Sequence, residues 1–234
     1  MNDPEKNDGR PPIELLDMNR SMAELRKELA ALEQRRAALP ADAPQTERAR
    51  LDLEIAETLL GMLRAKEAWD LARPAFDVFV ANELWQEAAE AADLLYRTDQ
   101  PGSIAALGNG IWLAVTWPIR PETTVTLLHH IVEETPDDSD GAAVAAAAAH
   151  YIADLRTEGK EHENLTFLTG QVLGQVARRH RGIEDPELVK TWMEVLELND
   201  PDVLLPRLAR ILDVIVGDDW WYDRDAIRAK LPVN

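Results

Sequence analysis

The chain has 234 residues, of which 46% are hydrophobic and 29% are charged, so a generally disordered protein is excluded and one large domain, with or without an arm, is expected. The absence of cysteine excludes disulfides, thiolate metal sites and a cysteine nucleophile. A formal charge of −18 opposes binding to nucleic acid and to anionic membranes, which are held through clustered Lys and Arg, so neither is predicted as a partner.

The first twelve residues, MNDPEKNDGRPP, carry no apolar periodicity. Their consecutive prolines and their Asn-Asp-Gly turn predict a disordered tail over residues 1–12. The same stretch lacks the apolar run of a signal peptide, which favours a cytoplasmic location.

Two heptad stripes come next, each with apolar residues at alternating spacings of three and four. The first stripe consists of Leu15, Met18, Met22, Leu25, Leu29, Leu32, Arg36 and Leu39, with Arg36 as its one polar interruption. The second runs over residues 51–76, and the prolines of PADAP separate the two. This pattern predicts an antiparallel coiled-coil hairpin arm over residues 13–73. The arm either packs on the rest of the chain or pairs with a partner or a second copy through Leu25, Leu29 and Leu32.

Residues 74–234 are predicted to form a compact body of short antiparallel helices. Capping residues mark several of the helix starts, namely Pro121, Asp140, Asp185 and Asp200. No strand or hairpin signal is present, so the predicted fold class is all-α. The segment 68–101 resembles a tetratricopeptide unit in length and rhythm. Its glycine and small-residue positions are out of register with that family, so the resemblance implies only a helical-repeat-like architecture.

Residues 100–119 carry no charge until Arg120 follows. Prolines, glycines and polar residues make this stretch a poor membrane span. It is predicted to be a central core helix that breaks at 108–110, with Trp112 and Trp117 packed inward. A ligand pocket at the glycine break is the alternative.

Histidines followed by a carboxylate four residues later are the candidate metal ligands. His130 with Glu134 and His150 with Asp154 each lie on one helix face, and two such helices could together bind a divalent metal. The alternative is that each pair only stabilises its own helix. Stricter motifs are missing: there is no Glu-x-x-His, no phosphate-binding glycine loop and no G-x-S-x-G. No catalytic residue and no cofactor are therefore predicted.

An aromatic cluster near the carboxyl end, Trp220, Trp221 and Tyr222, is surrounded by aspartates. Exposed aromatics with an acidic rim suit a basic partner segment. Alternatively, these side chains fix the last helix to the body.

Together these features predict a non-catalytic protein–protein interaction module, such as an adaptor, a scaffold or an assembly chaperone. We expect a protein partner and a homo-oligomer formed through the arm. Two alternatives stay open: a metal- or small-ligand-binding helical enzyme that uses the histidine-bearing helices, and an acidic DNA-mimic inhibitor.

Overall fold

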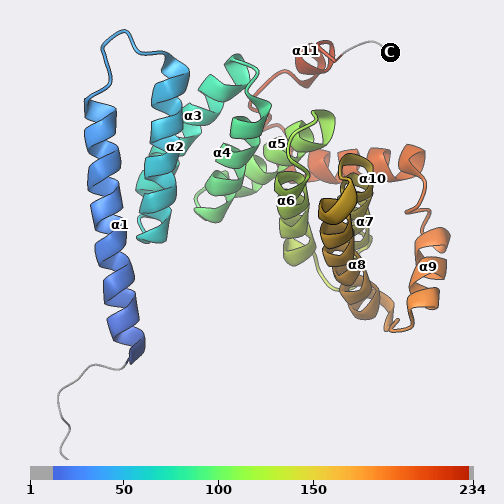
Figure 1. The fold of residues 1–234 in the computed structure, drawn as a ribbon. Helices are drawn as coiled ribbons and strands as arrows, with labels where there is room; N and C mark the ends of the chain where they lie inside the picture. Colours follow the sequence, from blue (N-terminus) through green and yellow to red (C-terminus); the bar gives the residue numbers. More distant parts are fainter. Residues whose placement is uncertain (1–12, 232–234) are drawn as a thin grey trace, which may run out of the picture.

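The computed structural model describes residues 13–231, and over that range the chain is all-helical, with eleven helices and no strand (Figure 1). The all-α prediction is thus confirmed for the described residues. The helices are α1 (Ile13–Ala37), α2 (Gln45–Gly61), α3 (Ala65–Ala81), α4 (Trp85–Arg97), α5 (Ser103–Thr116), α6 (Pro121–Glu134), α7 (Asp140–Arg156), α8 (Gly159–Arg181), α9 (Pro186–Val195), α10 (Pro201–Val216) and α11 (Arg224–Arg228). The predicted tail, residues 1–12, lies outside the described residues, as do the side chains of Leu15 and Met18.

The helices form two rows. Each helix from α1 to α8 packs against the next, and α2, α4, α6 and α8 also contact one another in sequence along one row (Figure 1). α3, α5 and α7 lie behind that row, and α10 returns across α5 and α7. As a result, no described helix crosses the outer face of the front row.

Side-chain caps mark the starts of four described helices, α7, α9, α10 and α11. The Asp185 and Asp200 carboxylates accept hydrogen bonds from backbone N–H groups two residues later, at 2.8 and 2.9 Å, and each is followed by a proline in the first turn. These predicted starts are confirmed. The predicted cap at Asp140 is wrong by one residue, because the Ser139 hydroxyl accepts from the N–H of Gly141 instead.

The second heptad helix is not continuous, contrary to the prediction for residues 51–76. α2 ends at Gly61, and α3 begins at Ala65. Leu63 adopts a left-handed conformation with φ of 61°, and the Arg64 N–H donates to the Leu59 carbonyl at 2.9 Å. This is a Schellman end without the usual glycine, so composition alone gave no stop signal. The boundary placed at 73/74 falls inside α3.

The predicted break at 108–110 is also wrong, because α5 runs unbroken from Ser103 to Thr116. Its glycines serve close helix packing instead. A Cβ atom on Gly108 would overlap Val216 of α10, and one on Gly110 would lie 2.6 Å from the Ala92 Cβ of α4. α5 is a core helix in which Trp112 is buried, and Trp117, which directly follows the helix, is half-buried. Among residues 13–231, no helix is long and apolar enough to cross a membrane.

Candidate functional site

The aromatic cluster at the carboxyl end is tied to the middle of α5. The side-chain amide of the buried Asn109 accepts a hydrogen bond from the backbone N–H of Trp221 at 3.1 Å. The same amide donates one to the backbone carbonyl of Asp219 at 3.2 Å. The Tyr222 hydroxyl donates to the backbone carbonyl of Asn109 at 2.6 Å. Burial raises the pKa of the Tyr222 phenol well above its ordinary value, although the Arg224 guanidinium opposes this shift.

Aromatic stacking completes this attachment. The Trp221 ring lies edge-on to Phe76 at 5.1 Å between centroids, and the Arg73 guanidinium sits 3.9 Å from the Trp221 ring centroid. Arg224 covers Trp220 in the same way, at 3.8 Å. The three aromatic side chains thus pack against the core of the chain, and each of them stays partly exposed.

The leucines of the predicted arm face α2. Leu29 and Leu32 are each only 7% exposed, and Leu25 lies beside Gly61. Exposed ion pairs accompany this packing, such as Arg35 with Glu54 at 3.1 Å. Of the three leucines, only Leu32 also lines an open surface feature, the groove described below.

His130 and Glu134 on α6 have separate protein partners. His130 Nε2 lies 2.9 Å from an Asp93 carboxylate oxygen of α4, while the Glu134 carboxylate accepts from the Tyr96 hydroxyl at 2.7 Å. Burial, and then this hydrogen bond, raise the pKa of Tyr96 above its ordinary value.

His150 and Asp154 on α7 likewise contact different side chains. The His150 ring bonds the Thr169 hydroxyl at 2.8 Å, and Asp154 lies 3.8 Å from His162 Nε2. Burial lowers the pKa of His150. Within the described part of the chain, no group of three or more His, Cys, Asp or Glu side chains could hold a metal ion.

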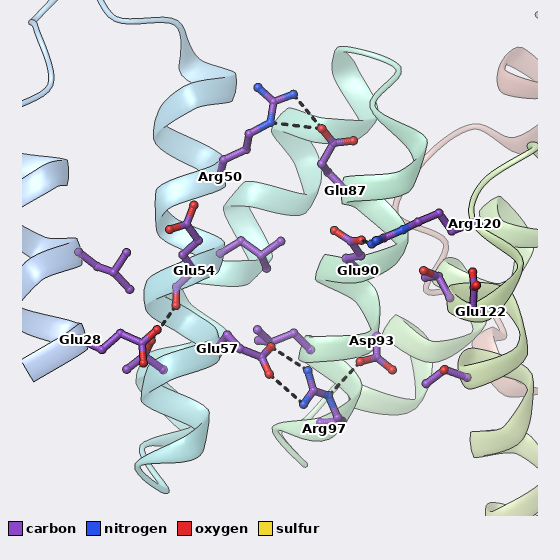
Figure 2. Close-up of a pocket in the computed structure, with 16 residues that line it drawn as sticks. Glu28, Arg50, Glu54, Glu57, Glu87, Glu90, Asp93, Arg97, Arg120 and Glu122 are labelled. Atoms are coloured by element: carbon purple, nitrogen blue, oxygen red, sulfur yellow. Dashed lines mark hydrogen bonds and ion pairs between the residues drawn. The ribbon is translucent and has the colours of Figure 1, made fainter. Parts of the chain in front are cut away.

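A groove of about 830 Å³ lies on the front row of helices (Figure 2). It is lined by side chains from α1, α2, α4 and α6, in chain order Glu28, Leu32, Arg50, Leu53, Glu54, Glu57, Thr58, Glu87, Glu90, Asp93, Leu94, Arg97, Arg120, Glu122, Thr123 and Thr126. Seven carboxylates thus face three guanidinium groups in this groove. The groove is strongly acidic, and three leucines supply its aliphatic lining.

The three arginines are held by carboxylates of neighbouring helices. Figure 2 shows Arg50 of α2 reaching Glu87 of α4 at 2.8 Å, and Arg97 of α4 reaching Glu57 of α2 at 2.8 Å. Arg97 also pairs with Asp93 at 2.9 Å. In the same way, Arg120 pairs with Glu90. The Arg50–Glu87 and Arg97–Glu57 pairs fasten α2 and α4 to each other, and the Arg120–Glu90 pair joins α4 to the start of α6. The groove keeps an excess of negative charge.

The other three carboxylates, those of Glu28, Glu54 and Glu122, do not pair with these arginines in the described residues. Glu122 stands at the groove edge beside Glu161 of α8. The pKa of Glu161 is raised by a hydrogen bond with Glu122 and then by the repulsion of its charge. Negative charge is therefore crowded here, and a cation would relieve it.

Comparison with protein-family models, with curated proteins and with solved structures found no match for this chain. The groove was missed by reasoning from the sequence, although a signal for it exists. Arg50, Glu54 and Glu57 repeat at spacings of four and three along α2, which places them on one face. A charged face of this kind is usually just solvated, and only the packing of α4 and α6 beside α2 makes it one side of a groove.

Proposed function

We propose that the chain is a non-catalytic adaptor that binds a positively charged segment of a partner protein in the groove across α1, α2, α4 and α6. The observation that carries this proposal is the excess of carboxylates, gathered from four helices around an aliphatic lining. Complementary charge steers a partner to such a surface and sets its register.

The size of the groove also favours a protein segment over a single small ion as its ligand. Its volume of about 830 Å³ falls in the range of ligand-sized clefts, and its lining runs across four helices. Leu32, Leu53 and Leu94 offer apolar contact to the stems of Lys and Arg, which cover apolar surface while their charged heads bind carboxylates.

The finer features predicted from the sequence belong to this proposal. The coiled-coil character of the arm is supported by the packing of α1 along α2, which makes Glu28 and Leu32 one wall of the groove. A helical-repeat-like stack is supported by the two rows, since such stacks offer extended binding faces. Self-association through the arm and a chaperone role stay predictions, and the burial of Leu29 argues against the former.

The test uses a displayed library of random peptides, selected on the full chain at low salt. The enriched peptides are expected to be rich in Lys and Arg. Their binding is then compared between the native chain and the variant Glu28→Gln, Glu54→Gln, Glu122→Gln, which removes three groove charges and keeps the carboxylates that pair with Arg50, Arg97 and Arg120. Of the three positions, Glu54 also loses an exposed ion pair with Arg35. We expect this variant to bind about tenfold more weakly, because it loses attraction for the cationic side chains.

The matched control removes three exposed acidic charges outside the groove, as Asp138→Asn, Glu194→Gln, Asp218→Asn. It is expected to bind within about twofold of the native chain, since only distant, solvent-screened charge is changed. A library that enriches no basic peptide would overturn the proposal, and so would equal weakening of both variants.

A further inference from the structure

A small apolar pocket lies beside the acidic groove, between α6, α7 and α8. It has a volume of about 130 Å³ and is lined mainly by aliphatic side chains. The lining residues are Val125, Thr126, His129, Val132, Ala146, Ala149, Leu168, Thr169 and Val172. The alanines of α7 form much of this wall, because their short side chains leave a hollow between the longer side chains of α6 and α8.

The pocket and the groove are adjacent. Thr126 of α6 lines both of them, so the acidic groove and the apolar pocket meet at this residue. The groove is lined by α2, α4 and α6 of this row, and the pocket has exposed lining residues on α6 and α8, namely Thr126 and Leu168. A single extended segment that follows this row would pass from carboxylates to an apolar hollow.

The pocket has the size of one side chain. Cavities of about 150 Å³ lined by aliphatic and aromatic groups accept a benzene molecule, so a leucine, methionine or phenylalanine side chain matches a hollow of about 130 Å³. Apolar surface is also exposed here, since Leu168 is 51% exposed at the pocket. A large exposed apolar side chain at a hollow suits a binding surface.

We infer that this pocket receives one large apolar side chain of the same partner segment whose cationic residues occupy the groove. The recognised motif is then a basic stretch with one apolar anchor at a fixed distance. This inference rests on the proposed function. Charge selects a foreign basic segment over a second copy, because the chain itself carries −18 and would bring further negative charge to an acidic groove.

The probes are fluorescein-labelled peptides with an arginine-rich half, a Gly-Ser spacer and a carboxy-terminal leucine, matched with peptides that end in alanine. Spacers of one to about six residues cover the unknown separation, at roughly 3.3 Å for each extended residue. Binding to the full chain is measured by fluorescence anisotropy. At one favoured spacer length, the leucine peptide is expected to bind roughly tenfold more tightly than its alanine match, since it buries one more large apolar side chain.

Two variants of adjacent residues on α8 locate the effect. Leu168→Gln removes a pocket wall and is expected to bring the leucine peptide to the affinity of the alanine peptide, with the alanine peptide unchanged. Phe167→Gln removes a more exposed apolar side chain that does not line the pocket, and both peptides should bind it like the native chain. Both substitutions are at the surface, and unfolding curves check that each variant is folded.

The outcomes separate this inference from the proposed function. Equal affinity of leucine and alanine peptides at every spacer length would overturn the anchor pocket while the groove proposal stands. An equal loss in Phe167→Gln and Leu168→Gln would also overturn the pocket, because it would show unspecific apolar contact. If alanine peptides do not bind but a leucine peptide binds in a manner that depends on Leu168, the groove proposal fails and the pocket is supported. Absence of binding by every peptide overturns both.

Discussion

The two ends of the described chain are attached to the body in different ways. α1 lies along α2 through one stripe of leucines, with exposed ion pairs beside it. The segment that contains Trp220, Trp221 and Tyr222 is instead bonded to a buried amide in the centre of α5 and enclosed by aromatic rings. The amino-terminal end of the described chain thus packs on the surface of one neighbouring helix, whereas the carboxyl-terminal segment is hydrogen-bonded to the core.

Both ends were candidates for partner binding because both are rich in large apolar residues. The structure shows that a run of large apolar residues indicates a buried surface but does not indicate which part of the molecule covers it. At α1 the partner is the adjacent helix in sequence. At the carboxyl end it is a helix more than a hundred residues earlier, as the separation between Asn109 and Trp221 shows.

The substitution Asn109→Ala tests the fixed end and has the largest expected effect. It removes the acceptor of the Trp221 N–H and the donor to the Asp219 carbonyl, so the free energy of unfolding should fall by about 3 kcal/mol. Urea unfolding followed by tryptophan fluorescence measures this change. The control is Asn164→Ala at an exposed position of α8, which should change stability by no more than about 0.5 kcal/mol. Similar losses in both variants would show that the amide does not hold this segment.

The substitution Leu29→Ala tests the amino-terminal end, where α1 packs on α2. Loss of this buried side chain should weaken the packing of α1 on α2 by about 2 kcal/mol. Because α1 packs mainly on α2, the effect should be local: amide hydrogen exchange should speed up in α1 and stay unchanged in α7. Lys27→Ala, at an exposed position of the same helix, is the control. Faster exchange throughout the chain would contradict the contrast between the two ends.

The substitution Tyr222→Phe sharpens the account of the fixed end. Loss of the hydrogen bond to the Asn109 carbonyl should lower stability by about 1 kcal/mol at neutral pH. The pKa of this phenol is raised in the folded state, so its contribution is complete below the ordinary tyrosine pKa of about 10 and is lost as the pH rises above that value. The difference between native chain and variant should therefore shrink above pH 10. Unfolding curves at several pH values measure it, and a difference that grows with pH would contradict the buried hydroxyl.

The substitution Leu63→Gly has the smallest expected effect. It tests the turn between α2, on which α1 packs, and α3. Leu63 is 90% exposed and left-handed, so glycine removes backbone strain without loss of packing. The added freedom of the unfolded chain offsets part of the gain, which leaves stability raised by about 0.5 kcal/mol. Lys66→Gly, inside α3, should lower stability by about 1 kcal/mol, and calorimetry compares the two. A decrease in both would show that the turn is not strained.

Parts of the fold could be predicted because their causes are local. An aspartate followed by proline is a local signal for a helix start, because it depends only on adjacent residues. The starts of α9 and α10 at Asp185 and Asp200 follow this signal. The end of α2 could not be predicted, since its left-handed residue is a leucine that has no preference for that conformation. The glycines of α5 were misread as a break because only the neighbouring Val216 and Ala92 show that they allow close helix packing.

The candidate site shows the same division. Its acidic character follows from composition, and the spacing of Arg50, Glu54 and Glu57 on one helix face is readable in the sequence. By itself the sequence determined that the chain is helical and acidic, with the apolar stripes that demand burial. Only the tertiary structure decided which helices stand side by side, and hence that the carboxylates of α1, α2, α4 and α6 share one groove. The physical reason is that helix formation depends on neighbours a few residues apart, whereas a groove depends on side chains that packing brings together from distant parts of the chain.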